Sequence, residues 1–208
     1  MPQPKKKPRG SYHHGDLRQA LVDATLTIVE REGTGAVSLS AVARRVGVSP
    51  QASYNHFPEK GALLAAAAVE VMRVLALEVR GALEAAAGPG ERFEAAGIAY
   101  VRFAKANAAK FRLLGAPELA NKAAYPALLA AHEDAFGVLF EAIEVCQKAG
   151  LVRKSDPRRL AIAAWSTVHG VAHLAVDGLL SVTQVEGDSL ELARDAIRSL
   201  YKGLRAAR

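Results

Sequence analysis

The chain has 208 residues but only one cysteine, Cys146, and this excludes a disulfide bond within the chain. A single thiol is typical of a reducing compartment, so the composition predicts a cytoplasmic protein. We interpret Cys146 as a small buried core residue; sensing of oxidants and bridging of two subunits are the alternatives. The N-terminus is basic and lacks the apolar stretch of a signal peptide, which argues against export.

Long hydrophobic runs are missing as well. The longest stretch without Asp, Glu, Lys or Arg extends from Leu160 to Val176. It is too short for a comfortable membrane span, and it contains Ser166, Thr167, His169 and His173. A buried helix therefore suits this stretch better, and the sequence predicts no membrane partner.

Motifs of common enzymes are also absent from the sequence. It has no phosphate-binding Gly-rich loop, no Gly-x-Ser-x-Gly and no His-Glu-x-x-His. None of the six histidines has Glu three residues before it, which removes a di-iron helical bundle. His169 and His173 have a spacing that suits Zn²⁺, but the nearest carboxylate on that face, Asp177, lies a further turn away. We therefore predict no catalytic residue, no metal site and no cofactor, and place His169 in a ligand pocket or at an interface.

Strand signals are scarce too, because β-branched residues are scattered and Gly and Pro fall between helical runs. The pattern predicts an all-α fold of about nine helices, with the penultimate one at about 157–180 and the last at about 189–206. The breaks between the helices beyond residue 59 are Gly88-Pro89-Gly90, Gly115-Ala116-Pro117, Tyr125-Pro126, Gly150, Asp156-Pro157 and Gly187-Asp188.

Residues 38–57 are the most informative segment that is present. Ser38 can cap a helix whose apolar face repeats at helical spacing, and Gly47 can end that helix in a left-handed conformation. Ser49-Pro50 then begins a second short helix with a polar N-terminal edge. This pattern is typical of a helix-turn-helix, whose second helix enters the DNA major groove. The alternative is two ordinary helices of a small domain that happen to be joined by Gly.

Positive charge lies close to this segment. The net charge is +6, and residues 1–60 hold nine Lys/Arg against five Asp/Glu. Such a bias suits the neutralisation of phosphates. A membrane surface would attract it as well, but this region lacks an apolar face to insert. The proline-rich, basic composition near the start of the chain predicts that residues 1–14 form a disordered arm. This arm is either a solubilising tail or a segment that lies along DNA.

These features together resemble the TetR family of transcriptional repressors. The resemblance is strongest over residues 15–75, where the matching residues are Leu39, Val42-Ala43, Val46-Gly47-Val48-Ser49, Tyr54, Phe57, Lys60 and Leu63-Leu64. The segment Tyr12-His13-His14-Gly15-Asp16-Leu17-Arg18 and the later Trp165…His169-Gly170 resemble one subgroup of that family. Ser53, Glu59 and Gly61 depart from the usual pattern, which leaves the operator sequence open.

The resemblance implies a DNA-binding domain over 15–75, with its reader at about 38–57, and a ligand-binding and dimerisation domain over 76–208. It implies a homodimer through the last two helices, bound to palindromic operator DNA. The residues expected to hold phosphates are Ser38, Ser40, Ser49 and Lys60. Those expected to meet bases or the backbone beside them are Pro50, Gln51, Tyr54 and Asn55, with Gln51 and Asn55 suited to adenine edges.

The resemblance also implies a small-molecule effector, expected to be mainly apolar, that releases the repressor from DNA. Aromatic and Met side chains at helical spacing are usually core residues, and in this family some of them line an effector cavity. Those considered are Met72, Phe93, Tyr100, Phe103, Phe111, Phe136, Phe140 and Trp165. The ligand set predicted from them is Met72, Tyr100, Phe103, Phe140 and Trp165, together with His169. The alternative function is an effector-independent nucleoid-associated or cell-division protein on the same scaffold, and a helical enzyme is a remote third.

Overall fold

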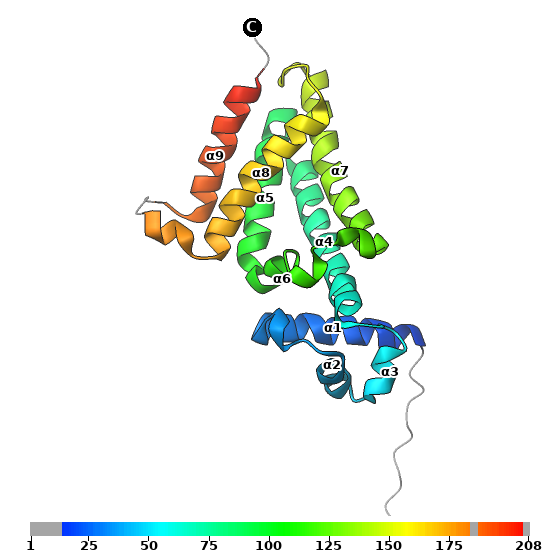
Figure 1. Cartoon of the computed structure of the whole chain (residues 1–208). Helices are drawn as coiled ribbons and strands as arrows, with labels where there is room; N and C mark the ends of the chain where they lie inside the picture. The colour runs from blue at the N-terminus through cyan, green and yellow to red at the C-terminus, as the bar shows by residue number, and fades with distance from the viewer. Residues whose placement is uncertain (1–13, 184–186, 206–208) are drawn as a thin grey trace, which may run out of the picture. The chain divides into compact units, whose positions relative to one another are not determined.

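The computed structural model describes residues 14–183 and 187–205, and these residues form nine α-helices (Figure 1). Short 3-10 turns connect some of them, and the only β pairing in the described part is an isolated antiparallel bridge between Val152 and Arg205. The predicted all-α class and helix number are confirmed. None of the described helices is long and apolar enough to cross a membrane.

The chain divides into two compact units, and the division falls inside one helix, α4 (Lys60–Ala85), between Ala67 and Ala68. The first unit contains α1 (His14–Glu32), α2 (Leu39–Val46) and α3 (Pro50–Tyr54). α1 therefore begins at the last residue of the predicted arm, and residues 1–13 of that arm lie outside the described residues.

The first unit is built as its sequence pattern predicts. Ser38 caps α2 by accepting a hydrogen bond from the amide of Ala41. Gly47 ends the helix at φ 81°, a left-handed conformation that costs glycine little. Ser49 caps α3 by accepting from the amide of Ala52, and Pro50 occupies the first helical position, where no amide hydrogen is needed. These local signals set the angle between the two helices.

Ser53 explains one departure from the family pattern. Its side chain is fully buried, and its hydroxyl lies 2.7 Å from the carbonyl oxygen of Pro50 and 3.3 Å from that of Leu39. Because Leu39 belongs to α2, this hydroxyl ties the two helices together. A buried hydroxyl is stable only when it is hydrogen-bonded, and here it has acceptors in both helices.

The second unit consists of the rest of α4 and five further helices: α5 (Pro89–Ala106), α6 (Ala108–Leu113), α7 (Pro126–Lys148), α8 (Pro157–Val176) and α9 (Ser189–Leu204). α5, α8 and α9 pack against one another, and α7 packs on α5 and α8 (Figure 1). α8 ends at Val176, before the predicted position 180, because Gly178 adopts a left-handed φ of 71°. α9 ends at Leu204, and the predicted last residue, 206, lies outside the described residues.

The packing of α5 against α8 and α9 depends on Gly97. A Cβ atom at this position would lie 2.5 Å from Cδ1 of Ile197 and 2.9 Å from Cγ1 of Val168. Both neighbours are buried. The absence of a side chain at residue 97 therefore lets three helices approach closely, and a methyl group there would force their side chains apart.

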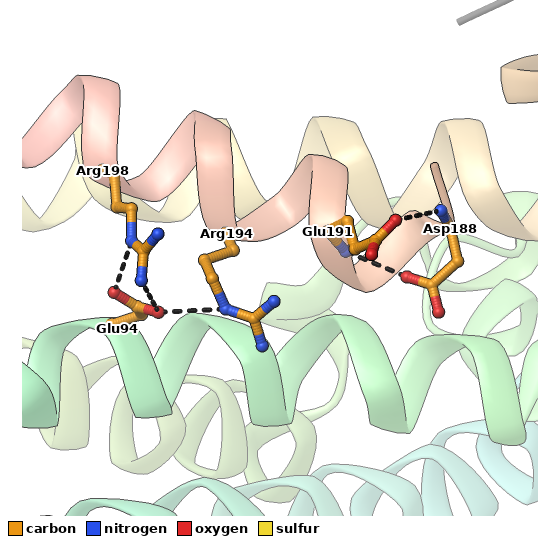
Figure 2. A network of polar contacts seen from close by, with 5 residues as sticks. All are labelled: Glu94, Asp188, Glu191, Arg194 and Arg198. Atoms are coloured by element: carbon orange, nitrogen blue, oxygen red, sulfur yellow. Dashed lines mark hydrogen bonds and ion pairs between the residues drawn. The ribbon is translucent and has the colours of Figure 1, made fainter. Parts of the chain in front are cut away.

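Two sets of polar contacts involve α9, a capping box at its start and ion pairs with α5 (Figure 2). At its start, the Asp188 carboxylate accepts from the amides of Leu190 and Glu191, while the Glu191 carboxylate accepts from the amide of Asp188. This reciprocal arrangement is a capping box. Further along, Arg194 and Arg198 both donate to the carboxylate of Glu94 on α5, with shortest distances of 3.1 Å. The network sets the rotation of α9 relative to α5.

Candidate functional site

The exposed edge of α3 carries the side chains predicted to meet bases. Pro50, Gln51, Tyr54 and Asn55 are all exposed, with 49% of Tyr54 accessible, whereas Ser53 points into the protein. The side-chain nitrogen of Gln51 lies 3.4 Å from the side-chain oxygen of Asn55, so the two amides meet on one helix face. Amide side chains offer a donor and an acceptor each, the combination that an adenine edge requires.

The residues predicted to hold phosphates surround this edge. Ser38, Ser40 and Ser49 are exposed, and Lys60 is half-buried at the start of α4. The Oγ atoms of Ser38 and Ser49 accept the capping hydrogen bonds, and a hydroxyl that accepts in this way still has its own proton to donate. The capping role and a phosphate contact are therefore compatible.

Two further cations in this unit were absent from the predicted set. Arg44 and Arg45 are exposed in the last turn of α2. Two adjacent arginines within a helix-turn-helix are a sequence signal for phosphate binding, because the fold itself does not require them. The prediction omitted them because capping and apolar periodicity give no information about exposed positions.

The second unit encloses a cavity of about 480 Å³ whose walls are mainly apolar and aromatic. Its walls come from α4 to α9, so segments far apart in the sequence build it together. The lining residues are Met72, Leu75, Ala76, Val79, Phe93, Ala96, Gly97, Tyr100, Phe111, Leu114, Gly115, Lys122, His132, Glu133, Ala135, Phe136, Leu139, Ala164, Trp165, Val168, His169, His173, Ile197 and Leu200. Volume and composition both match those of small-ligand sites.

The cavity brings together four of the six residues in the predicted ligand set, Met72, Tyr100, Trp165 and His169. Phe103 and Phe140 do not line the cavity, so we remove them from the predicted ligand set.

The cause lies in helix geometry. On α5 the lining residues are Phe93, Ala96, Gly97 and Tyr100, at positions i, i+3, i+4 and i+7, and this stripe ends at Tyr100. Phe103, one turn further, is packed in the interior with 1% of its surface exposed.

Phe140 has a different environment. The guanidinium carbon of Arg158 lies 5.3 Å from the centre of its ring, a cation–π contact. This ring therefore packs against an α8 side chain rather than the cavity. Spacing along one helix identified the aromatic residues but could not distinguish cavity walls from interior packing.

A chain of polar side chains crosses the wall between α5 and α8. The hydroxyl of Tyr100 lies 2.7 Å from Nδ1 of His169, and the rings of His169 and His173 pack edge to face with centroids 4.5 Å apart. Trp165 stacks near His169, at 4.9 Å between centroids. Phe111 of α6 contacts both histidine rings. One polar region of the lining is therefore built by Tyr100, Trp165, His169 and His173, and Lys122, His132 and Glu133 are the other polar residues of the lining.

Burial controls the protonation of these groups. It raises the pKa of Tyr100 to about 12, although a hydrogen bond with the Trp165 side chain opposes the shift. Burial also lowers the pKa of His169, and the nearby His173 lowers it further. The pKa of His132 is likewise lowered, first by burial and then by the charge of Lys122. Tyr100, His169 and His132 are therefore neutral at neutral pH.

Metal binding has little support in this region. Among residues 14–183 and 187–205, no group of three His, Cys, Asp or Glu side chains is placed to hold a metal ion. His169 uses Nδ1 for Tyr100, while His173 lies 3.9 Å from the Asp177 carboxylate, which is itself paired with Arg112.

Both units of the chain match models of protein families. Residues 21–67 match bacterial regulatory proteins of the tetR family, and residues 93–200 match the tetracyclin repressor-like C-terminal domain. The chain belongs to the TetR family. It is thus a transcriptional regulator with a helix-turn-helix DNA-binding domain.

Some relatives match nearly the whole chain, and others match only part of it. A structure of a protein with unknown function from Rhodococcus sp. RHA1 is 30% identical, with a TM-score of 0.79, over 94% of this chain and 99% of its own. The fatty acid degradation regulator FadR from Bacillus halodurans shares the fold, with a TM-score of 0.70 and 18% identity over 97% of this chain and 100% of its own. The transcriptional regulator BetI from Rhizobium meliloti is 41% identical over 38% of this chain and 38% of its own length. This TetR-family regulator therefore spans well under half of BetI in that match.

Proposed function

We propose that this TetR-family protein is a cytoplasmic repressor that a small, mainly apolar molecule releases from a palindromic operator. The observation that carries the proposal is the enclosed cavity of about 480 Å³ in the C-terminal unit of a chain that also carries a DNA reader. A DNA-binding protein without an effector needs no such cavity. Apolar walls with a few polar atoms match a small ligand.

The DNA contacts follow from the exposed edge of α3. Gln51 and Asn55 read bases, Tyr54 and Pro50 contact bases or the adjacent backbone, and Ser38, Ser40, Ser49 and Lys60 bind phosphates. Arg44 and Arg45 add positive charge on α2. Phosphate contacts give affinity that falls with salt, and base contacts give specificity.

A homodimer supplies the second reader. The exposed face of α8 carries Ile162, Ser166, Gly170 and Leu174, four positions one helical turn apart, with 50% of Ile162 exposed. Apolar residues at its ends and small residues at its centre suit close packing against another helix. On α9 the positions Leu192, Ala196, Ser199 and Gly203 form a stripe of mostly small, exposed or half-exposed residues at helical spacing. We propose that these two stripes pair with their copies about a twofold axis.

Leu174→Glu tests this interface, because it places a charge on the stripe and leaves the helix intact. Sedimentation of the wild type should give a dimer and that of Leu174→Glu a monomer, with equal helical content. Arg153→Glu, an exposed substitution between α7 and α8, is the matched control and should remain dimeric. A wild-type protein that is monomeric at micromolar concentration would contradict the proposed dimer.

Coupling between ligand and DNA follows from α4. This single helix contributes Leu63 and Leu64 to the first unit and Met72, Leu75, Ala76 and Val79 to the cavity wall. A ligand that binds more tightly to the DNA-free state shifts the population toward that state. The coupling free energy is then the difference between its affinities for the two states.

The experiment begins with selection of binding sites from random DNA, which should return an inverted repeat with half-site centres roughly 34–36 Å apart. A library of apolar compounds is then screened by thermal shift, and each hit is added to an operator titration. Hits that weaken operator binding support the proposed function. If every stabilising compound left operator affinity unchanged, the protein would be an effector-independent DNA binder.

A further inference from the structure

The polar region of the cavity wall has a defined direction of hydrogen bonding. The phenol oxygen of Tyr100 and Nδ1 of His169 share a hydrogen bond of 2.7 Å, and the Trp165 ring lies beside His169, with 4.9 Å between ring centroids. A phenol O–H is a good donor, and the unprotonated nitrogen of a neutral imidazole is a good acceptor. This pairing favours donation from the phenol to the imidazole.

The protonation states agree with this direction. The pKa of Tyr100 is raised to about 12, so the phenol keeps its proton at neutral pH. The pKa of His169 is lowered by burial and by His173, so the imidazole is neutral and carries one proton. Since Nδ1 accepts from Tyr100, that proton must lie on Nε2. The contact with Tyr100 thus favours a single tautomer of His169.

The charged side chains of the cavity lining are Lys122 and Glu133. Lys122 lowers the pKa of His132, and Glu133 follows His132 on α7. Asp177, the carboxylate nearest to His173, is held by Arg112. The Trp165–Tyr100–His169 chain therefore faces aromatic and aliphatic walls, including Phe111 and Met72. An ionic head group placed there would lose its hydration without gaining an opposite charge.

We propose that this cavity selects a neutral, mainly apolar ligand with a hydrogen-bond acceptor, such as a ketone or ester oxygen, bound by Nε2–H of His169. The inference rests on the proposed function, since it assigns the chemical class of the effector. Tyr100 is a positioning residue, which holds the imidazole and its tautomer, and the Trp165 ring packs beside the imidazole. Ligands whose only polar group is a cation have no acceptor to meet at this wall.

The test uses four probes with one carbon framework: benzylacetone, butylbenzene, the amine that corresponds to benzylacetone, and phenylbutyrate. Trp165 is the only tryptophan in the chain and lines the cavity, so its fluorescence reports binding directly. Because the hydrocarbon leaves water more readily than the ketone, the readout is the change in their Kd ratio between wild type and His169→Phe. Loss of one hydrogen bond should change the ratio by about tenfold against the ketone. Measured against butylbenzene, the Kd of the amine should change less than about twofold, since an ammonium offers no acceptor to Nε2–H. The carboxylate can accept from Nε2–H but carries a charge that is not matched at this wall, so the wild type should bind it less tightly than the ketone.

His132→Phe is the matched control, because it makes the same replacement at another histidine of the lining and should leave the ratio of ketone to hydrocarbon unchanged. Tyr100→Phe should weaken the preference for the ketone only in part, since His169 stays but its tautomer is no longer fixed. A long-range ¹H–¹⁵N spectrum should show His169 with its proton on Nε2 in the wild type.

Several results would overturn the inference: equal weakening of ketone and hydrocarbon by His169→Phe, a His169-dependent preference for the amine or the carboxylate, an Nδ1–H tautomer, or no binding of any probe. The operator titration separates this inference from the proposed function. If the ketone depends on His169 but leaves operator binding unchanged, the ligand class stands and ligand-controlled repression fails.

Discussion

The two units of this chain obtain their functional surfaces in opposite ways. In the reader, the side chains proposed to meet DNA lie within a few residues of the caps and the glycine that position them. In the C-terminal unit, Tyr100 and His169 are 69 residues apart and meet only because α5 and α8 pack together. A local surface depends on backbone signals, whereas the cavity depends on the fit of whole helices. The units should therefore respond differently to mutation.

The largest effect is expected for the exposed edge of α3. Gln51→Ala or Tyr54→Ala should weaken operator binding by about 1–3 kcal/mol, because each removes a side chain that we propose to contact the operator. Titration of the selected operator at fixed salt measures this, and circular dichroism should be unchanged because both side chains are exposed. Ligand affinity should also remain at the wild-type value. Loss of ligand binding in either variant would contradict the division of labour between the units.

Gly97→Ala tests how far the stability of the C-terminal unit depends on close helix packing. The added methyl group meets Ile197 and Val168 at distances below normal contact, so the cavity unit should lose about 1–2 kcal/mol despite the better helix propensity of alanine. Urea denaturation followed by Trp165 fluorescence measures the loss. Gly137→Ala in α7 is the matched control, because its Cβ would meet no atom within 4 Å, and it should be stabilising by about 0.5–1 kcal/mol.

A double variant tests the cause of that loss. Ile197→Val removes the Cδ1 atom that lies nearest to the new methyl group. Gly97→Ala combined with Ile197→Val should therefore lose less stability than the sum of the two single variants. Strict additivity would mean that the glycine is needed for another reason.

Stability of the cavity unit should also depend on pH. The pKa values of His132 and His169 are lowered in the folded state, so the unfolded chain binds protons more readily. The resulting stability is fully present above the ordinary pKa of about 6.5 and is lost as the pH falls below it. Thermal midpoints measured from about pH 8 to about pH 5 should fall, and the slope should flatten when both histidines are replaced by Gln. An unchanged slope in that variant would assign the pH dependence to other groups.

The smallest effect concerns the ion network of α5 and α9. Glu94→Gln removes the charge that pairs with Arg194 and Arg198, and the loss should be about 0.5–1 kcal/mol because all three groups are partly exposed. Salt should reduce the difference between variant and wild type. A loss that is independent of salt would indicate packing rather than charge.

This contrast also explains what could be predicted from the sequence. The ends of α2 and the start of α3 were predicted correctly because Ser38, Gly47 and Ser49 act through neighbouring amides and local backbone angles. The cavity could be predicted only in part. Phe103 and Phe140 have the composition of lining residues, but their environment depends on helix rotation and on Arg158, which no local pattern encodes.

The hydrogen-bonded chain in the wall was also beyond sequence reasoning. Tyr100 and His169 were identified separately as polar anchors, but no spacing rule relates residues on α5 to residues on α8. The histidine tautomer depends on the contact with Tyr100, which becomes visible only once the three-dimensional structure is known.

Coupling between cavity occupancy and operator binding can be measured through linkage. The operator Kd should be measured against increasing concentration of the most stabilising compound, and the Kd of that compound should be measured with and without saturating operator. Both constants should rise by the same factor, about 5–150-fold, because coupling is reciprocal. Ligand-controlled repression would be wrong if a compound saturated the Trp165 signal while the operator Kd stayed constant.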